Sequence, residues 1–186
     1  GRELPADESI PVDIRYASPD YFTAMGMSLL DGRDFAPTDD DVATPVAIIS
    51  AALAEKLWPG ERAVGKRVDA MRVKGNTPNL LAVVGVVGDV RDAALSDPAK
   101  PTLYMPYTQT PAGMWNAQSR SLVLVTRTIP TPETVVRGIQ QAVMSVDPSL
   151  PLLDKQSMES WLARSLATTR FNMLLLTTLA ILALVL

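Results

Sequence analysis

The stretch LLAVVGVVGDV, residues 80–90, decides the fold of this 186-residue chain because nearly all of its side chains are apolar. A strand that is apolar on both faces is typical of a sheet that is covered on both sides. We therefore predict that residues 80–90 form a central strand.

Strand and helix patterns alternate on either side of this stretch. The run VAIIS after Pro45 predicts a strand that ends at Ser50, and Ser50 is the expected N-cap of a helix over 51–57. Pro59-Gly60 would end that helix. Further strands are predicted over residues 10–17, 27–30, 66–73 and 103–105.

A short helix is expected after the first strand. Ser18 is its predicted N-cap, Pro19 its first helical residue, and Gly26 its end. Gly32 is expected in a turn that leads into an acidic loop over residues 34–44.

After residue 120 the pattern predicts a strand–helix–strand unit. Residues 121–127 (SLVLVTR) favour a strand, and Thr131-Pro132-Glu133 begins a helix that Asp147-Pro148 ends. Apolar side chains recur at helical spacing in it: Val135, Val136, Ile139, Val143 and Val146. Residues 150–153 are predicted to return as a strand.

The last sixteen residues, FNMLLLTTLAILALVL (171–186), carry no charge and are apolar on every helical face. A spanning helix needs about 20 residues, and sixteen rise by only about 24 Å. Because the residues from Ser157 onward continue a helical pattern, we predict a long helix that enters a membrane through 171–186, in a piece of a longer protein. A buried core helix is the alternative interpretation.

Composition restricts the chemistry of this chain. The sequence contains no histidine and no cysteine, which excludes thiol nucleophiles, disulfides, Ser-His-Asp triads and His/Cys zinc sites. The net charge of −3 divides into −7 over residues 1–41 (ten acidic, three basic) and +4 over the rest (ten acidic, fourteen basic). No run of Lys and Arg exceeds two residues, so nucleic acid is not an expected partner.

Two glycine-containing segments imitate nucleotide sites. Residues 60–66 (GERAVGK) match a phosphate loop through the lysine, but Arg67 stands where Ser or Thr would hold magnesium. We predict a glycine-bounded turn with solvated bases there. The Gly85-x-x-Gly88-Asp89 pattern lacks the third glycine and the following helix of a dinucleotide site, so its glycines are expected to permit close backbone packing.

Two further segments imitate metal and nucleophile sites. Asp34, Asp39, Asp40 and Asp41 lack the alternating oxygens and distal glutamate of a calcium loop, which predicts a solvated acidic loop. Ser50 lacks the flanking glycines of a nucleophile elbow. We therefore expect no catalytic, cofactor-binding or metal-ligating residue, with a carboxylate-based hydrolase as an open alternative.

Four segments occur here in the order typical of one family: SPDYFTAMGMSLLDGRDF (18–35), PVAIISAALAEKLWPGERAVGKRV (45–68), VVGVVGDVR (83–91) and PTLYMPY (101–107). Over about residues 12–186 the chain resembles the MacB-like periplasmic core domain of FtsX-type ABC transporter permeases. The segment VDPSLPLLDKQSM (146–158), with the apolar helix after it, looks like the end of that domain.

The resemblance implies an α+β fold with a porter-like α/β subdomain from both ends of the segment, an inserted sabre-like α/β subdomain, and a long helix entering the membrane. Residues 1–44 and 115–156 would form the porter-like part, 45–114 the sabre-like part, and 157–186 the stalk and the start of the transmembrane helix.

The resemblance also implies a non-enzymatic role, in which the domain relays ATP-driven motion to periplasmic substrates or partners. The implied partners are an ABC ATPase on another chain or region, a second permease subunit (the same or a different one) and a periplasmic adaptor. The expected location is the bacterial inner membrane, with residues 1 to about 165 on the periplasmic side. A lipoprotein-releasing permease domain and a soluble α/β ligand-binding module remain alternatives.

Overall fold

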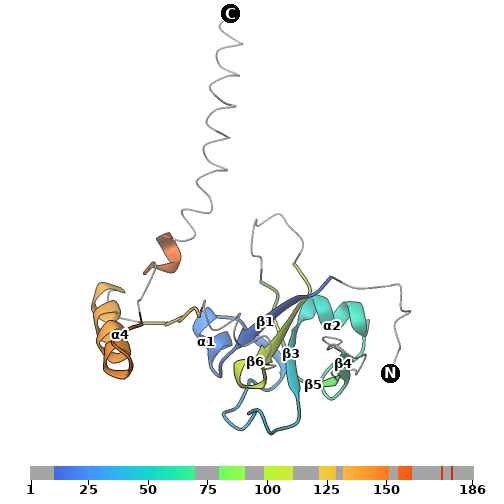
Figure 1. Cartoon of the computed structure of the whole chain (residues 1–186). Coiled ribbons are helices and arrows are strands. Elements are labelled where there is room, and N and C mark those ends of the chain that lie inside the picture. Colours follow the sequence, from blue (N-terminus) through green and yellow to red (C-terminus); the bar gives the residue numbers. More distant parts are fainter. Residues whose placement is uncertain are drawn as a thin grey trace, which may run out of the picture. The chain divides into compact units, whose positions relative to one another are not determined.

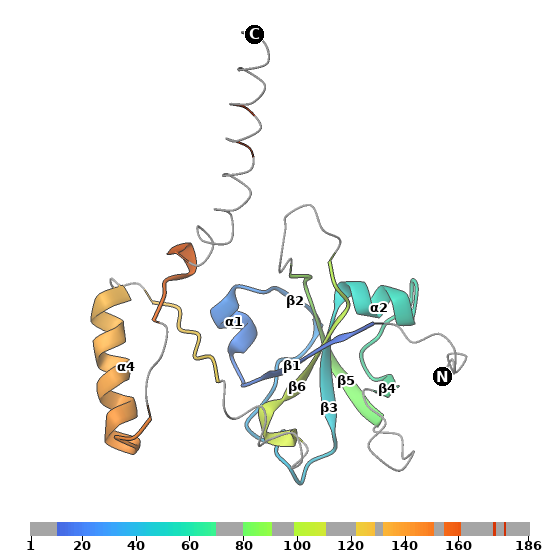
Figure 2. The same ribbon diagram turned by 45° about the horizontal axis from the view of Figure 1, so that its top comes forward.

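The computed structural model describes residues 11–69, 80–90, 99–110, 122–128, 132–150 and 155–160, together with Met173 and Thr177. The chain forms two compact units, Gly1–Arg127 and Thr128–Leu186. Figure 1 labels most elements of the two units, and β2 is labelled in Figure 2.

The first unit is built on one six-stranded mixed sheet (Figure 2). Its strands are β1 (Asp13–Ala17), β2 (Leu29–Gly32), β3 (Val46–Ser50), β4 (Arg67–Asp69), β5 (Leu80–Val87) and β6 (Thr102–Pro106). The strand order is β1-β6-β3-β5-β2, and β4 also pairs with β5. β1 runs parallel to β6 and β3 parallel to β5, whereas the other pairs are antiparallel. The predicted central position of β5 is confirmed.

β5 has neighbours on both of its edges. One edge pairs with β3, and the other is shared end to end by β4, which pairs with residues 80–82, and β2, which pairs with residues 85–87. Between these two short strands, Arg33 N–H donates to the Val84 carbonyl at 2.9 Å and Val83 N–H donates to the Lys66 carbonyl at 2.9 Å. The backbone of β5 is therefore hydrogen-bonded along most of its length.

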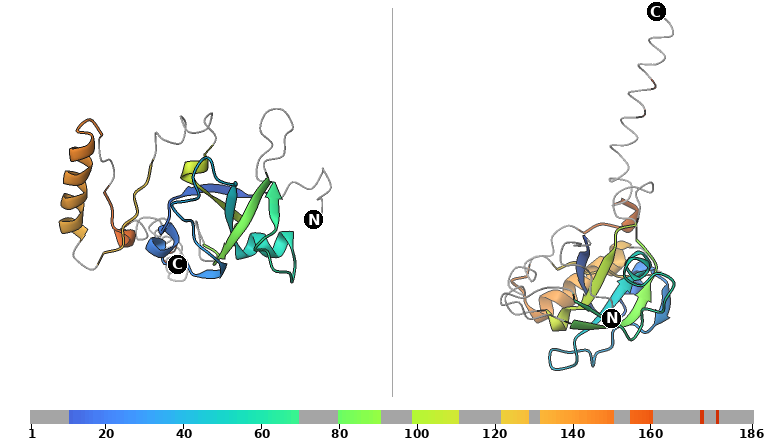
Figure 3. Two further views of the ribbon diagram at one scale, coloured as in Figure 1. Left: turned by 90° about the horizontal axis from the view of Figure 1, so that it is seen from below. Right: turned by 90° about the vertical axis from the view of Figure 1, so that its right-hand side faces the viewer.

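Both faces of the sheet are covered. The helical elements of this unit are α1 (Tyr21–Met25), α2 (Ala51–Leu57) and the 3-10 helix η1 (Tyr107–Gln109). Ala47 and Ile49 of β3 pack in one core cluster with Leu53 of α2, whereas Ile48 packs in a second cluster with Phe22 of α1. Side chains alternate along a strand, so the two clusters lie on opposite faces. Figure 3 shows α2 beside the sheet in two further views.

The start of α1 differs from the prediction. Its N-cap is Asp20, not Ser18, and Asp20 has a left-handed backbone with φ of 65°. That conformation cannot belong to a right-handed helix, so Ser18 and Pro19 form a separate turn closed by Tyr21 N–H donating to the Ser18 carbonyl at 3.3 Å. Gly26 ends the helix as predicted, with φ of 71°.

The predicted strand over residues 121–127 is wrong for the residues described. Residues 122–127 carry no regular secondary structure, and Val123 is 83% exposed. A run of consecutive apolar residues becomes a strand only where a neighbouring strand supplies hydrogen bonds. Among the described residues 122–128 and 132–150, the predicted helix is present without a strand before it.

The second unit contains α4 (Pro132–Val146), which confirms the helix predicted from Pro132. After it, Asp147 N–H donates to the Val143 carbonyl at 2.9 Å, and residues 158–160 are helical. In the described part of the chain, no helix is long and apolar enough to cross a membrane. The predicted strand over 150–153 and the predicted helix through 171–186 fall mainly outside the described residues.

The sheet also bears on the expected subdomains. β1 and β2 precede residue 45 and the other four strands follow it, so one sheet contains strands from both sides of that residue. The expected boundaries at 44/45, 114/115 and 156/157 stay predictions.

Candidate functional site

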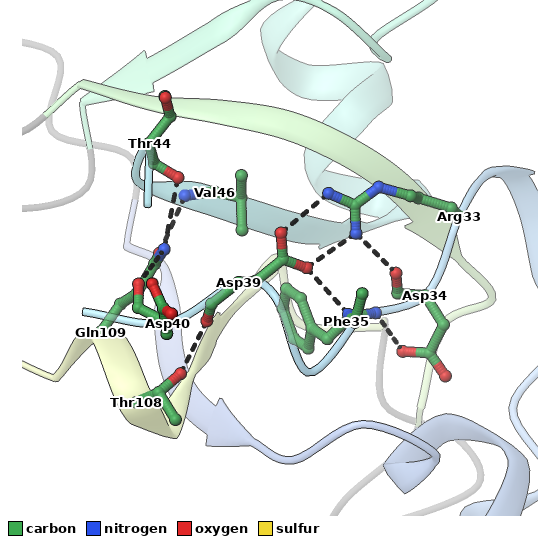
Figure 4. A network of polar contacts seen from close by, with 10 residues as sticks. Arg33, Asp34, Phe35, Asp39, Asp40, Thr44, Val46, Thr108 and Gln109 are labelled. Carbon is green, nitrogen blue, oxygen red and sulfur yellow. Dashed lines mark hydrogen bonds and ion pairs between the residues drawn. The ribbon is translucent and has the colours of Figure 1, made fainter. Parts of the chain in front are cut away.

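A network of polar contacts holds the loop between β2 and β3 (Figure 4). We call Arg33, Asp39, Thr108 and Gln109 the polar clasp. Arg33 Nη1 and Nη2 donate to the two carboxylate oxygens of Asp39 at 2.7 and 2.8 Å. The Ala36 N–H adds a third bond to Asp39 at 2.8 Å. The Asp39 side chain is only 7% exposed, so these donors replace its water.

Thr108 and Gln109 of η1 form the other half of the polar clasp, and they lie 69 residues after the loop residues Asp39 and Asp40 that they bind. Thr108 Oγ1 donates to the Asp39 carbonyl at 2.7 Å. Gln109 Nε2 donates to the carbonyls of Asp40 and Thr44 at 2.9 and 3.2 Å, and its Oε1 accepts from Val46 N–H at 3.0 Å. One amide side chain therefore satisfies two carbonyls of the loop and the first N–H of β3.

In the polar clasp, the positive charge of Arg33 is paired with the negative charge of Asp39. Hydrogen bonds from Arg33 lower the pKa of Asp39 below its ordinary value, against the opposing effect of burial. The same contacts raise the pKa of Arg33. Asp39 is therefore ionised and paired with Arg33. Both of its carboxylate oxygens already accept hydrogen bonds, whereas a general base needs an oxygen that is available to take a proton.

The four candidate aspartates do not gather around one point. Asp34 accepts from Phe35 N–H at 2.6 Å, and burial raises its pKa. Asp40 accepts from Ala43 N–H at 3.0 Å. Each carboxylate thus serves its own turn, while Asp41 is exposed. The expectation of a solvated acidic loop is wrong for Asp39, because Arg33 and η1 bury it.

Ser50 is the N-cap of α2, as predicted. Its Oγ accepts from Leu53 N–H at 3.3 Å and also from Thr102 N–H of β6 at 3.0 Å. Asp89 adds a second cap that the sequence did not indicate, because its Oδ1 accepts from Ala52 N–H at 2.8 Å. With two donors on a buried hydroxyl, Ser50 is placed as a structural residue.

The segment imitating a phosphate loop is a turn into β4, as predicted. Gly60 and Gly65 have φ of 69° and 89°. Its bases are paired rather than simply solvated: Lys66 Nζ pairs with Glu61 and lies 5.2 Å from the Trp58 ring centroid.

A second ion pair connects this turn to β2. Arg62 donates to the two carboxylate oxygens of Asp31 at 2.8 and 2.9 Å. The glycine pattern in β5 also has a structural cause, because a Cβ on Gly85 would lie 2.4 Å from the Arg33 carbonyl oxygen. The expected close backbone packing at Gly85 is confirmed.

The described residues form contacts that fix loops rather than a reactive constellation. No group of three or more acidic side chains among them is placed to hold a metal, and none of their buried side-chain nitrogen or oxygen atoms lacks a partner. Gln109, Asp89 and the Arg62–Asp31 pair were missed from the sequence, because each joins segments distant along the chain.

The description "MacB-like periplasmic core domain" belongs to a family model that matches residues 2–142. The chain is similar to the periplasmic region of MacB from Actinobacillus actinomycetemcomitans, with 18% identity, a TM-score of 0.46, and coverage of 69% of this chain and 54% of that one. It is also similar to the extracellular domain of the noncanonic ABC-type transporter YknZ from Gram-positive bacteria, with 22% identity, a TM-score of 0.38, and coverage of 58% and 47%. No curated protein sequence matches.

Proposed function

Since the chain belongs to the family of MacB-like periplasmic core domains, we propose that it is an extracytoplasmic domain of an ABC transporter permease that relays ATP-driven motion to periplasmic substrates or partners. The observation that carries this proposal is the family match over residues 2–142. The chain spans about half of the two solved structures named above, so the partners and the location belong to the proposal.

The proposed setting is the bacterial inner membrane, with residues 1 to about 165 outside the cytoplasm. An ABC ATPase on another chain or region supplies the energy, and two permease subunits and a periplasmic adaptor complete the assembly. The uncharged stretch 171–186 supports a membrane attachment. In this arrangement 115–156 is the second porter-like segment and 157–186 the stalk.

The domain itself is proposed to be non-catalytic. The polar clasp is the main polar network among the described residues. All of its described contacts are with backbone groups or belong to the Arg33–Asp39 ion pair. A residue set of this kind holds a loop in place, which suits a domain that transmits force.

The relay is tested in the intact transporter, reconstituted in vesicles with its ATPase. Leu166→Pro interrupts the helix that the sequence predicts from Ser157 into the apolar stretch, because proline removes a hydrogen bond and clashes with the preceding turn. We expect the ratio of transport to ATP hydrolysis to fall. Leu166→Ala preserves helix propensity and is the matched control. An unchanged ratio in Leu166→Pro contradicts the proposal.

The remaining alternatives are distinguished by simpler measurements. A soluble ligand-binding module would be monodisperse without detergent and would show saturable thermal stabilisation by a small molecule. A lipoprotein-releasing permease would retain the ATP coupling but would extract lipid-anchored proteins from the vesicles.

A further inference from the structure

Arg127, the last residue of the first unit, lies on the C-terminal end of α1. Its Nε donates to the Ala24 carbonyl at 3.3 Å, a contact between residues 103 positions apart. A Cβ built on Gly26 would lie 2.4 Å from Arg127 Nη2, so the guanidinium occupies the space that a side chain at position 26 would take.

The end of α1 presents carbonyls that need donors. Gly26 N–H donates to Thr23 at 3.1 Å and Met27 N–H donates to Phe22 at 2.8 Å, the two hydrogen bonds of a Schellman ending. Arg127 supplies a donor to the next carbonyl, that of Ala24. Cationic side chains commonly bind the last carbonyls of a helix in this way.

The residues just before Arg127 have little packing of their own. Leu122, Val123 and Leu124 are 74%, 83% and 65% exposed. Arg127 therefore makes a specific attachment of an otherwise exposed segment, at the point where the chain passes to Thr128 and the second unit.

α1 leads from this attachment into the core of the sheet. Phe22 is 2% exposed and meets Tyr104 of β6 edge to face, with centroids 5.0 Å apart and an interplanar angle of 83°. The centroid of the Phe22 ring also lies 5.9 Å from that of Phe35, which stands four residues before Asp39 of the polar clasp. Closely packed rings of this kind move together rather than compress.

We propose that Arg127 is the positioning residue through which movement of the second unit enters the first, by way of α1 and the Phe22–Tyr104 contact. This inference rests on the proposed relay function and names its entry point. At residue 127 the guanidinium adds a side-chain contact with α1 to the covalent connection between the two units.

The attachment is tested first, without ATP. Because residues 1–186 contain no cysteine, Val123→Cys carries a single nitroxide in this 186-residue chain in detergent. We expect Arg127→Ala to raise the mobility of that label in its electron paramagnetic resonance spectrum, and Arg127→Lys to restore part of the restriction. Arg67→Ala, at an exposed position of β4, is the matched control and should leave the spectrum unchanged. An unchanged spectrum in Arg127→Ala overturns the attachment.

The delivery of motion is tested in the intact transporter. Nitroxides at Thr23→Cys on α1 and Glu55→Cys on α2 report a distance inside the first unit, and both positions are exposed. We expect this distance to shift between the nucleotide-free and the ATP-vanadate-trapped states, and Arg127→Ala to abolish the shift at an unchanged melting temperature. A shift that survives Arg127→Ala overturns this inference alone. A wild-type distance that never shifts also overturns this inference, because no motion then reaches the first unit through α1, whereas the relay function itself is tested by the ratio of transport to ATP hydrolysis in Leu166→Pro.

Discussion

Gly32 of β2 and Gly85 of β5 lie opposite each other in the sheet, and neither position has room for a Cβ atom. A Cβ on Gly32 would lie 2.2 Å from the Val84 carbonyl oxygen, and one on Gly85 would lie 2.4 Å from the Arg33 carbonyl oxygen. The backbones of β2 and β5 therefore approach closely just before Arg33 enters the polar clasp.

Gly85→Ala is expected to lower the free energy of unfolding by about 1–3 kcal/mol, because the obstructing atom is backbone and cannot rotate away. Gly88→Ala is the matched control, since its Cβ would meet only the Ser28 carbonyl oxygen at an ordinary 3.8 Å. Denaturant unfolding measures both. Equal losses in the two variants would mean that close approach is not what requires glycine at position 85.

Asp39→Asn removes the buried carboxylate of the ion pair with Arg33. We expect it to destabilise the fold by about 1.5–3 kcal/mol at neutral pH, the usual range for a hydrogen bond to a charged group. Because the folded-state pKa of Asp39 is lowered by Arg33, its stabilisation is present above the ordinary pKa and is lost as the pH falls through the lowered value. The difference between wild type and variant should therefore shrink in acid, as measured by unfolding at a series of pH values.

Asp34→Asn is the control for that titration, because burial shifts the pKa of Asp34 upward. Ionised Asp34 costs stability, so its variant should gain in stability relative to wild type as the pH rises through the ordinary range of a carboxyl group. If both variants follow the same pH dependence, the two carboxylates do not have the opposite environments described.

Gln109→Glu replaces the Nε2 donor with an anionic oxygen facing the carbonyls of Asp40 and Thr44. Repulsion from these two carbonyls should turn the side chain away and so also withdraw its acceptor from Val46 N–H. We therefore expect faster amide hydrogen exchange at Val46 and a loss of stability of about 1–3 kcal/mol. Gln141→Glu, on an exposed part of α4, is the matched control. Unchanged exchange at Val46 would contradict the role of Gln109 in the polar clasp.

The two caps of α2 should differ in cost. Ser50→Ala leaves two buried N–H groups, those of Leu53 and Thr102, without their acceptor, and each such group costs about 1–3 kcal/mol. Asp89→Ala removes one exposed cap bond, typically worth about 1 kcal/mol. Unfolding experiments should rank Ser50→Ala as the more damaging change, and the reverse order would show that the Ser50–Thr102 bond contributes little.

Local patterns were sufficient for much of the first unit. The apolar runs of β3 and β5 predicted buried strands, Ser50 and Gly26 were identified as helix ends, and Pro132 marked the start of α4. These signals depend on side chains within a few residues of one another, which is why a single sequence contains them.

Contacts between distant segments account for what the sequence did not predict. The sequence predicted a solvated Asp39 because the residues that cover its loop are distant along the chain. Thr108 lies 69 residues after Asp39, and Gln109 lies 69 residues after Asp40. Asp89 was recognisable in retrospect, since β3 and β5 are parallel and their carboxyl ends meet at one edge near α2. Residues 122–124 have the apolar pattern of a strand, but no strand of the described residues pairs with them, so they do not form one.

The pairing of β1 with β6 has a consequence for synthesis of the chain. Asp13 lies opposite Thr102, so the first strand has no place in the sheet until the ribosome has passed Pro106. Until then β3 also lacks its neighbour β6, and unpaired strand edges are available to other chains. A nascent or truncated chain that ends before Thr102 is thus exposed to aggregation, because the pairs that β6 makes with β1 and β3 form only after those residues have been made.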